Sequence, residues 1–234
     1  MRMELTVIKS AEPQIHETAV VDPTAKLHKN VIIEPYAVIG PNCEIGEGSI
    51  IGSHAVISKN VRMGKNNHVY PNAVIGEDPQ DLKFVGEYST VVIGNDNSFR
   101  EFVTIHRATG ENCETRIGSH NMLQAYTHVG QNCNCGDYIV MSCFPGAAGH
   151  VIVEDHAVIG GMSGIHQFVK IGACAMVGGM SKIVQDVCPF VIVDGNPARV
   201  VGLNSVGLAR NNITPEVRSW LKKAYRTIFR SGLK

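Results

Sequence analysis

The sequence predicts an all-β fold, a parallel β-helix of hexapeptide repeats, followed by a short α-helical segment at the C-terminus. Three observations support this prediction. Aliphatic residues recur every six positions from Ile15 to Ile75 without a break, the same phase returns at Ile93, and the apolar period becomes helical after Thr214. An alternating β-sandwich is the competing fold, but it would not hold a period of six over this length.

The six-residue units share one internal pattern. The first position of each unit is aliphatic, and the fifth is mostly small, as at Ala37 and Ala55. One large and one small inward side chain per unit suit the side and the corner of a narrow prism, whose stacked coils share one continuous core. The uninterrupted first positions are Ile15, Val21, Leu27, Ile33, Ile39, Ile45, Ile51, Ile57, Met63, Val69 and Ile75.

Two segments interrupt the repeat. The phase is lost over residues 77–92, which contain a proline and a glycine and which we expect to project from the prism as a loop. It is lost again over residues 109–116, and the repeat then continues from Ile117 to Ile183. The sequence G-N-P-A at 195–198 is expected to close it.

The chain therefore divides into an N-terminal extension (1–14), the β-helix (15–202) and a C-terminal helical segment (203–234). Within the last part, Thr214-Pro215-Glu216 reads as an N-cap, a proline at the first helical position and a first-turn acid. Apolar residues then follow with helical spacing, and basic residues lie largely on the other face. We expect this helix to cover the open end of the prism, because an uncovered terminal coil is a sheet edge open to aggregation.

Composition excludes several classes of function. A formal net charge of zero and 44% hydrophobic residues fit one main domain and favour neither a nucleic acid nor a membrane as partner. The first ten residues are charged and lack an apolar run, which argues against a signal peptide, and no stretch approaches the roughly 20 apolar residues that span a membrane. Seven cysteines without a C-x-x-C pair indicate reduced thiols in a cytoplasmic protein. Cys43, Cys133 and Cys135 fall at positions of the repeat that are suited to small apolar side chains, so we interpret them as residues that fill the core.

Most of the ten histidines are isolated at outward positions of the repeat. Four polar residues form a different group if three six-residue units make one coil of 18 residues. Gln131, His150 and His166 then lie on one face in successive coils, about 4.8 Å apart per coil. His106 joins them if residues 111–116 loop out of the repeat.

Imidazoles that converge in this way indicate either a metal site or proton transfer combined with recognition of a polar substrate. The gamma-class carbonic anhydrases, which are also β-helices, bind zinc between subunits through an H-x-x-x-x-H pair. No two histidines of this chain are five residues apart. We therefore expect no metal and no cofactor.

Several motifs resemble those of the UDP-N-acetylglucosamine acyltransferases that begin lipid A synthesis. They are G-E-D-P-Q-D-L-K-F at 76–84, T-I-H-R at 104–107, I-G-G-M-S-G-I-H-Q-F at 159–168, M-V-G-G at 176–179, V-D-G-N-P-A at 193–198 and Y-R-T-I-F-R-S-G at 225–232. The resemblance covers nearly the whole chain. It implies a left-handed β-helix, a homotrimer with active sites between subunits, and transfer of a (3-hydroxy)acyl chain from acyl carrier protein to the 3-hydroxyl of UDP-N-acetylglucosamine.

The same resemblance assigns roles to individual residues. It places an oxyanion-stabilising N–H at Gly149 and the end of the acyl pocket at Gly179. Asn204 and Arg210 would lie near the uracil or the phosphates. The remaining contacts to the sugar nucleotide would come from Asp81, Lys83, His106, His128, His150, His166 and Gln167.

Gln131 is the point at which the sequence departs from the family. The family motif H-[IV]-[AG]-H-[DN]-C has its general base at the second His, where this chain has Gln131, followed by Asn132. An amide cannot take up a proton near neutral pH. Three interpretations remain open. In the first, the protein is an acyltransferase that uses His128 or His150 as base, or that works more slowly without one. In the second it is a His-to-Gln form of the enzyme that retains substrate binding, and in the third it is a non-catalytic relative that binds a sugar nucleotide or acyl carrier protein. The basic helix face is a docking patch for the acidic carrier or, as we favour, a solvated surface.

Overall fold

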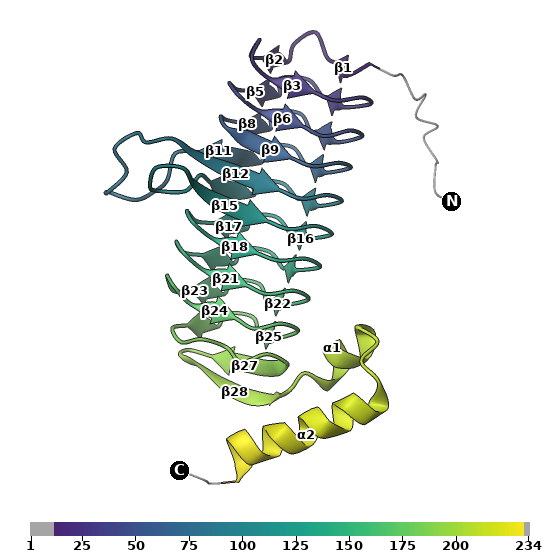
Figure 1. Cartoon of the computed structure of the whole chain (residues 1–234), viewed down its shortest axis with the longest axis vertical. Coiled ribbons are helices and arrows are strands. Elements are labelled where there is room, and N and C mark those ends of the chain that lie inside the picture. Colours follow the sequence, from purple (N-terminus) through teal and green to yellow (C-terminus); the bar gives the residue numbers. More distant parts are fainter. Residues whose placement is uncertain (1–11, 232–234) are drawn as a thin grey trace.

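The computed structural model describes residues 12–231, which form a three-sided prism of stacked coils with two helices at its C-terminal end (Figure 1). Each coil contributes one short strand to each of three sheets, which we name A, B and C in the order in which the chain visits them. Within each strand the second residue is buried and the first faces outward in most coils, as expected where side chains alternate between the faces of a sheet. The prediction of a parallel β-helix is confirmed.

Sheet A has a largely apolar outer face, with Ile50, Val140 and Met176 among its outward residues. Its strands, in spatial order, are β1 (Gln14–Ile15), β4 (Ile32–Ile33), β7 (Ile50–Ile51), β10 (His68–Val69), β13 (Ser98–Phe99), β16 (Met122–Leu123), β19 (Val140–Met141), β22 (Val158–Ile159), β25 (Met176–Val177), β27 (Val191–Gly195) and β28 (Ala198–Leu203). All are parallel except β28, which pairs with β27 in an antiparallel hairpin.

Sheet B has an apolar outer face near the N-terminus and then carries polar residues and glycines. Its strands are β2 (Val20–Val21), β5 (Val38–Ile39), β8 (Val56–Ile57), β11 (Val74–Glu77), β14 (Thr104–His106), β17 (His128–Val129), β20 (Gly146–Ala147), β23 (Gly164–Ile165) and β26 (Lys182–Ile183). The outward residues of the first four are all valines.

Sheet C differs because its outer face carries charged side chains, among them Lys26, Glu44, Arg62 and Arg116. Its strands are β3 (Lys26–Leu27), β6 (Glu44–Ile45), β9 (Val61–Met63), β12 (Ser89–Ile93), β15 (Cys113–Ile117), β18 (Asn134–Cys135), β21 (Ile152–Val153) and β24 (Lys170–Ile171). Sheet A and the N-terminal part of sheet B are therefore suited to contact with other protein, and sheet C is suited to water.

The core is one column of inward residues that runs the length of the prism. Cys43, Cys133 and Cys135 belong to it, with at most 4% of each residue exposed, so their interpretation as core filler is confirmed. Burial raises the pKa of the Cys133 thiol to about 12 and also raises that of Cys135. These thiols are therefore protonated and unreactive at neutral pH.

Residues with positive φ recur at the corners of the prism. At the corner between sheets B and C, Asn132, His150 and Phe168 have φ values of 57°, 63° and 67°. This left-handed backbone turns the chain sharply, and it stacks the outward side chains of successive coils above one another. The rings of His150 and Phe168 are stacked in this way, with centroids 4.7 Å apart.

The two interruptions of the repeat are shorter than the sequence suggested. The projecting loop covers residues 78–88 rather than 77–92, because β11 extends to Glu77 and β12 begins at Ser89. Residues 113–116 do not loop out; they belong to β15, which pairs with β12 along its whole length. Only the 109–112 turn leaves the repeat there.

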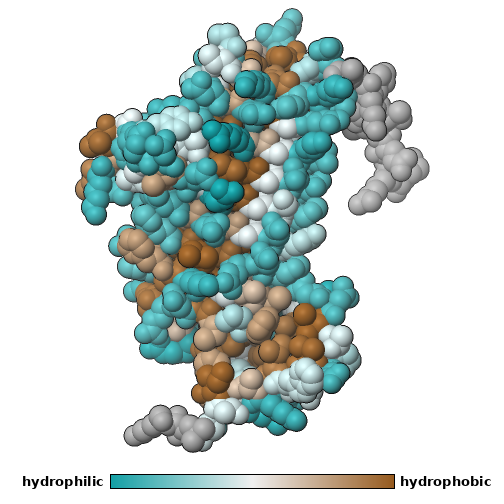
Figure 2. Space-filling view, viewed as in Figure 1, coloured by the Kyte–Doolittle hydropathy of each residue, from teal (hydrophilic) through white to brown (hydrophobic). Residues whose placement is uncertain are grey.

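The C-terminal segment contains two helices rather than the one expected, α1 (Ser205–Arg210) and α2 (Pro215–Arg230). Thr214 caps α2 as expected, and its hydroxyl accepts a hydrogen bond from the Val217 N–H (3.4 Å). Tyr225 and Phe229 of α2 pack against the core cluster, which closes the end of the prism. Figure 2 shows apolar surface gathered where the helices meet the last coils.

Residues 1–11 and 232–234 lie outside the described part of the chain, and with them most of the expected N-terminal extension and the segment tested for a signal peptide. In the described part, no helix is both long and apolar enough to span a lipid bilayer.

Candidate functional site

The imidazoles converge at one edge of the prism, where strands of sheet B lead into strands of sheet C. We call this edge the B–C corner. Ile105 pairs with Val129, Val129 with Ala147, and Ala147 with Ile165 in the parallel register of sheet B. The turns after these strands therefore stack, which confirms that His106, Gln131, His150 and His166 follow one another on successive coils of one corner.

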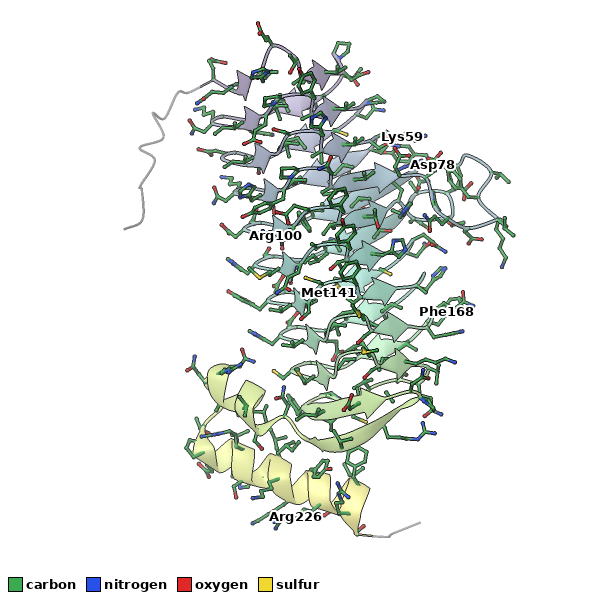
Figure 3. The ribbon with its side chains drawn as sticks, turned by 180° about the vertical axis from the view of Figure 1, so that it is seen from behind. Lys59, Asp78, Arg100, Met141, Phe168 and Arg226 are labelled. Atoms are coloured by element: carbon green, nitrogen blue, oxygen red, sulfur yellow. The ribbon has the colours of Figure 1, made fainter. Side chains whose placement is uncertain are left out.

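The projecting loop leaves the prism from the same corner, between β11 and β12 (Figure 1). It carries Asp81 and Lys83, and the Asp81 carboxylate accepts a hydrogen bond from the Lys83 N–H (3.0 Å). Figure 3 shows Asp78, at the base of the loop, and Phe168 along the same edge. The loop thus extends beside the stacked turns that carry the imidazoles.

Arg107 fastens this loop to the prism, although the sequence did not single it out. It is 1% exposed, and its guanidinium donates to the carbonyl oxygens of Gly76 (3.2 Å) and Ser89 (3.3 Å), on either side of the loop. It also pairs with the Asp78 carboxylate, which Lys59 approaches to 3.1 Å. Burial disfavours the charged form of Asp78, but hydrogen bonds from Lys59 and Arg107 hold its pKa below the usual value.

His106 and His128 face each other across neighbouring coils, with ring centroids 5.3 Å apart. His106 Nδ1 lies 2.6 Å from the Asp78 carbonyl oxygen, which only accepts, so Nδ1 carries the proton. His128 Nδ1 lies 2.9 Å from the Thr104 hydroxyl oxygen. Burial lowers the pKa of His128, and the neighbouring His106 lowers it further.

A groove of about 390 Å³ runs along sheet B beside His128. Gly146 and Gly164 form its floor, and a Cβ added at either would meet no atom within 4 Å. Its full lining is His128, Gly146, Ala148, Gly164, Ile165, His166, Lys182, Ile183 and Val184. The groove is therefore mostly apolar, with imidazoles on its wall, and it suits a narrow acyl chain beside a polar centre.

A larger hollow of about 680 Å³ lies on sheet C near the N-terminal coils, between Lys26, Glu44 and Arg62. It contains no imidazole, and the part of the B–C corner that it touches, at Thr24, Asn42 and Asn60, lies on earlier coils than the imidazoles. The smaller groove is the better candidate because it combines a mostly apolar lining with the imidazoles of His128 and His166.

Gln131 lies against Gly149 on the next coil. A Cβ built on Gly149 would sit 2.5 Å from Gln131 Nε2, so the Gln131 carboxamide occupies space that a larger residue at position 149 would take, and it would have to move away. Within the described residues, neither the Gln131 carboxamide nor the Gly149 N–H has a hydrogen-bond partner. Both are therefore available to a ligand at the B–C corner, although neither residue lines the groove itself.

Asn132 has a structural task that the sequence did not reveal. Its side chain accepts from the Thr109 N–H and donates to the Thr109 carbonyl oxygen, both at 3.0 Å. A carboxylate could make only the first of these bonds. Asn132 therefore holds the 109–112 turn in place and does not orient its neighbour Gln131.

Three of the expected site residues lie elsewhere in the single chain. Gly179 lies between β25 and β26, at the opposite edge of sheet B from the imidazoles. Asn204 is 6% exposed, and its side chain caps α1 through the Gly207 N–H (2.9 Å) while donating to the Cys174 carbonyl (2.8 Å). Arg210 is exposed at the end of α1.

The B–C corner does not offer a ready set of metal ligands. No group of three or more His, Cys, Asp or Glu side chains suited to a metal ion occurs between residues 12 and 231. His106 and His128 hold hydrogen bonds to oxygen atoms of Asp78 and Thr104 instead. The arrangement suits proton transfer and polar recognition beside an apolar groove.

Comparison with known proteins agrees with this geometry. Residues 186–234 match the family profile for UDP-N-acetylglucosamine O-acyltransferase, domain 2, and residues 24–59 and 42–77 match that for bacterial transferase hexapeptide repeats. An acyl-[acyl-carrier-protein]–UDP-N-acetylglucosamine O-acyltransferase of Gloeothece citriformis is 50% identical over 137 residues, which are 58% of this chain and 50% of that protein. The chain thus spans about half the length of the curated relatives it matches.

Solved structures extend the match to almost the whole prism. LpxA from Acinetobacter baumannii superposes with a TM-score of 0.91 at 43% identity, over 94% of this chain and 86% of that one. The chain belongs to the UDP-N-acetylglucosamine O-acyltransferase family. The Francisella novicida member of this family gives a TM-score of 0.92 at 38% identity, over 94% of this chain and 82% of that one. The fold is accordingly the left-handed parallel β-helix, as the resemblance implied.

Proposed function

We propose that the protein transfers a (3-hydroxy)acyl chain from acyl carrier protein to the 3-hydroxyl of UDP-N-acetylglucosamine, for lipid A synthesis. The observation that carries this proposal is the position of the unpaired Gly149 N–H, with imidazoles at the same corner and an apolar groove beside them. A thioester carbonyl needs a hydrogen-bond donor for its developing oxyanion, a proton acceptor for the attacking hydroxyl and a dry surface for its chain. The B–C corner offers all three.

The residues divide between the two substrates by their chemistry. Asp81, Lys83 and His106, at or beside the projecting loop, would bind the polar sugar nucleotide, together with Gln167 and His150 on the stacked turns. The glycine-floored groove would receive the acyl chain, with His166 on its wall. Gln131 would bind a polar group of the substrate, because its carboxamide is free to both donate and accept.

We also propose a homotrimer. The outer face of sheet A is largely apolar, that of sheet B is apolar near the N-terminus, and the two sheets meet at one corner, where Phe102, Tyr126 and Phe144 form an exposed stack with ring centroids 4.8 and 4.7 Å apart. A ring in which sheet A of each subunit meets sheet B of the next would bury both faces and would place this stack near the symmetry axis. A neighbouring subunit could then supply Gly179, Asn204 and Arg210, which lie away from the imidazoles within one chain.

A cytoplasmic location is proposed on chemical grounds. Acyl carrier protein and UDP-sugars are the proposed substrates, and all seven cysteines are free thiols.

The proposed activity is tested with the purified protein, UDP-N-acetylglucosamine and a 3-hydroxyacyl carrier protein. Mass spectrometry should detect the acylated sugar nucleotide in amounts that grow with enzyme concentration. Binding of UDP-N-acetylglucosamine is measured separately by calorimetry. Binding without product would identify a non-catalytic relative, and the absence of both would refute the proposal.

A further inference from the structure

We propose that His128 accepts the proton of the attacking hydroxyl in this chain, in the absence of a basic side chain at Gln131. This inference rests on the proposed acyl transfer. Its basis is a single juxtaposition: the His128 ring stands at the wall of the groove with one nitrogen held by Thr104 and the other without a partner among the described residues.

The hydrogen bond to Thr104 can orient the imidazole for this role. With its Nδ1–H donated to the Thr104 hydroxyl oxygen, 2.9 Å away, His128 keeps its lone pair on Nε2. The strands that carry the two residues are paired in register, Thr104 beside His128, so the contact is built into sheet B. Thr104 acts as a positioning residue in this arrangement.

The surroundings keep the His128 ring neutral and therefore able to take up a proton. The ring is partly buried, and burial disfavours its charged form. His106, 5.3 Å away, disfavours a second positive charge at the same place. A neutral imidazole that borders the groove has the properties of a general base.

The other imidazoles of the corner are less suited. His106 is 8% exposed and does not line the groove. His150 is stacked on Phe168 and also lies outside the groove. His166 does line the groove, but it is exposed, and its Nδ1 bonds only the adjacent Gln167 carbonyl oxygen at 3.1 Å, so no neighbouring strand fixes its ring.

The proposed step balances as follows. The hydroxyl oxygen of the sugar forms a bond to the thioester carbonyl carbon, and the hydroxyl proton moves to His128 Nε2. The carbonyl oxygen becomes an oxyanion beside the Gly149 N–H. When the C–S bond breaks, the thiolate of the carrier protein takes the proton back from His128, which returns to its neutral form.

The test compares matched His-to-Gln variants in the acyl-transfer assay. His128→Gln should lower kcat by at least about 100-fold, within the usual range for loss of a general base, and raise the Kd for UDP-N-acetylglucosamine by a much smaller factor, since the ring is also expected to contact the sugar nucleotide. His156→Gln, at a different corner, controls for loss of an imidazole. Thr104→Val should lower kcat less, and Thr104→Ser should restore it.

Each outcome bears on the proposal. Retention of kcat within about threefold in His128→Gln overturns it and leaves the acyl transfer intact. A greater loss in His166→Gln than in His128→Gln assigns the proton to His166 instead. An inactive parent protein refutes the acyl transfer and this step together. Nitrogen NMR of the parent protein gives a readout independent of turnover, since a His128 proton on Nε2 at neutral pH would contradict the required tautomer.

Discussion

Arg107 and Asp78 form an ion pair in which one partner belongs to the core and the other to the surface: the Arg107 side chain is 2% exposed and the Asp78 side chain 48%. The pair links the base of the projecting loop to the interior. The Asp78 carbonyl oxygen also accepts the His106 Nδ1–H. Asp78 therefore fixes both the position of the loop base and the orientation of the His106 ring.

Replacement of Arg107 by Met should therefore be costly. It leaves the carbonyl oxygens of Gly76 and Ser89 without their buried donor, and we expect the free energy of unfolding to fall by about 3 kcal/mol. The matched variant Lys59→Met removes only the exposed partner of Asp78 and should cost less than about 1 kcal/mol. Urea denaturation at a fixed protein concentration measures both. If both variants lost the same free energy of unfolding, the buried Arg107 guanidinium would contribute no more to stability than the exposed Lys59 ammonium, which would contradict this prediction.

A pair of glycine variants separates the groove from the scaffold. Gly164→Val should leave the stability nearly unchanged, because no atom lies within 4 Å of the added Cβ, but it should fill the groove and raise the KM for the acyl carrier substrate at least about tenfold. Gly118→Ala, at the corner between sheets C and A, should lower the stability and leave this KM unchanged, since its Cβ would lie 2.5 Å from the Gly136 carbonyl oxygen. Thermal melts and kinetics on Gly164→Val and Gly118→Ala give the comparison. Normal kinetics in Gly164→Val would exclude the groove as the acyl site.

The activity should depend on pH through His128. Burial, followed by the charge of His106, lowers its pKa below 6.5, while His166 and Lys182 line the same groove. The His128 lone pair thus remains available as the pH falls through 6.5, and the acid limb of the kcat profile should lie below that value.

The same shift affects stability. Between the pKa of His128 in the folded protein and 6.5, the unfolded chain binds more protons, so His128 makes the free energy of unfolding decline as the pH falls. A kcat profile with its acid limb above pH 7 would contradict this assignment.

Placing an imidazole at position 131 should compensate for the loss of His128. We expect Gln131→His to raise kcat by less than about tenfold when His128 is present, because a base is already in place. In the His128→Gln background it should raise kcat at least about tenfold. Gln131→Leu, which has no basic group, serves as the control. Activity confined to proteins with His at 131 would mean that His128 does not act as the base.

The aromatic stack provides a test of the trimer. Tyr126→Asp should place a charge near the proposed symmetry axis and shift the protein from trimer towards monomer in light scattering after size-exclusion chromatography. Tyr138→Asp is the matched control. Tyr138 is 50% exposed, close to the 48% of Tyr126, and stacks on His120 and His156 at another corner. The same oligomeric state in both variants would refute the proposed arrangement.

The sequence was sufficient to predict the coil and the convergence of the imidazoles, because both follow from a strict period. Once Val129 and Ala147 are paired, every residue in the adjoining turns has a determined neighbour. The ends of the loops were not predictable in this way. Ser89 and Val91 are buried in a five-residue strand whose register is set by its neighbour β15 rather than by the six-residue phase.

The roles of four residues at the candidate site were not identified from the sequence. The contacts of Arg107 depend on where the loop folds back, which no local pattern encodes. The clamp of Asn132 on Thr109 depends equally on a turn of irregular length. Gly146 and Gly164 could have been found, because glycine at an outward strand position, where earlier coils have valine, marks a local hollow in the surface.

The B–C corner is also the edge at which the chain departs from its strict period, at residues 78–88 and 109–112. Additional residues at a corner leave the strands of the coils above and below in register. An insertion within a strand would instead shift the register of every later strand. The length of these corner segments can therefore change without altering the pairing of the coils, provided that the contacts of Arg107 and Asn132, which fasten the segments to the prism, are kept.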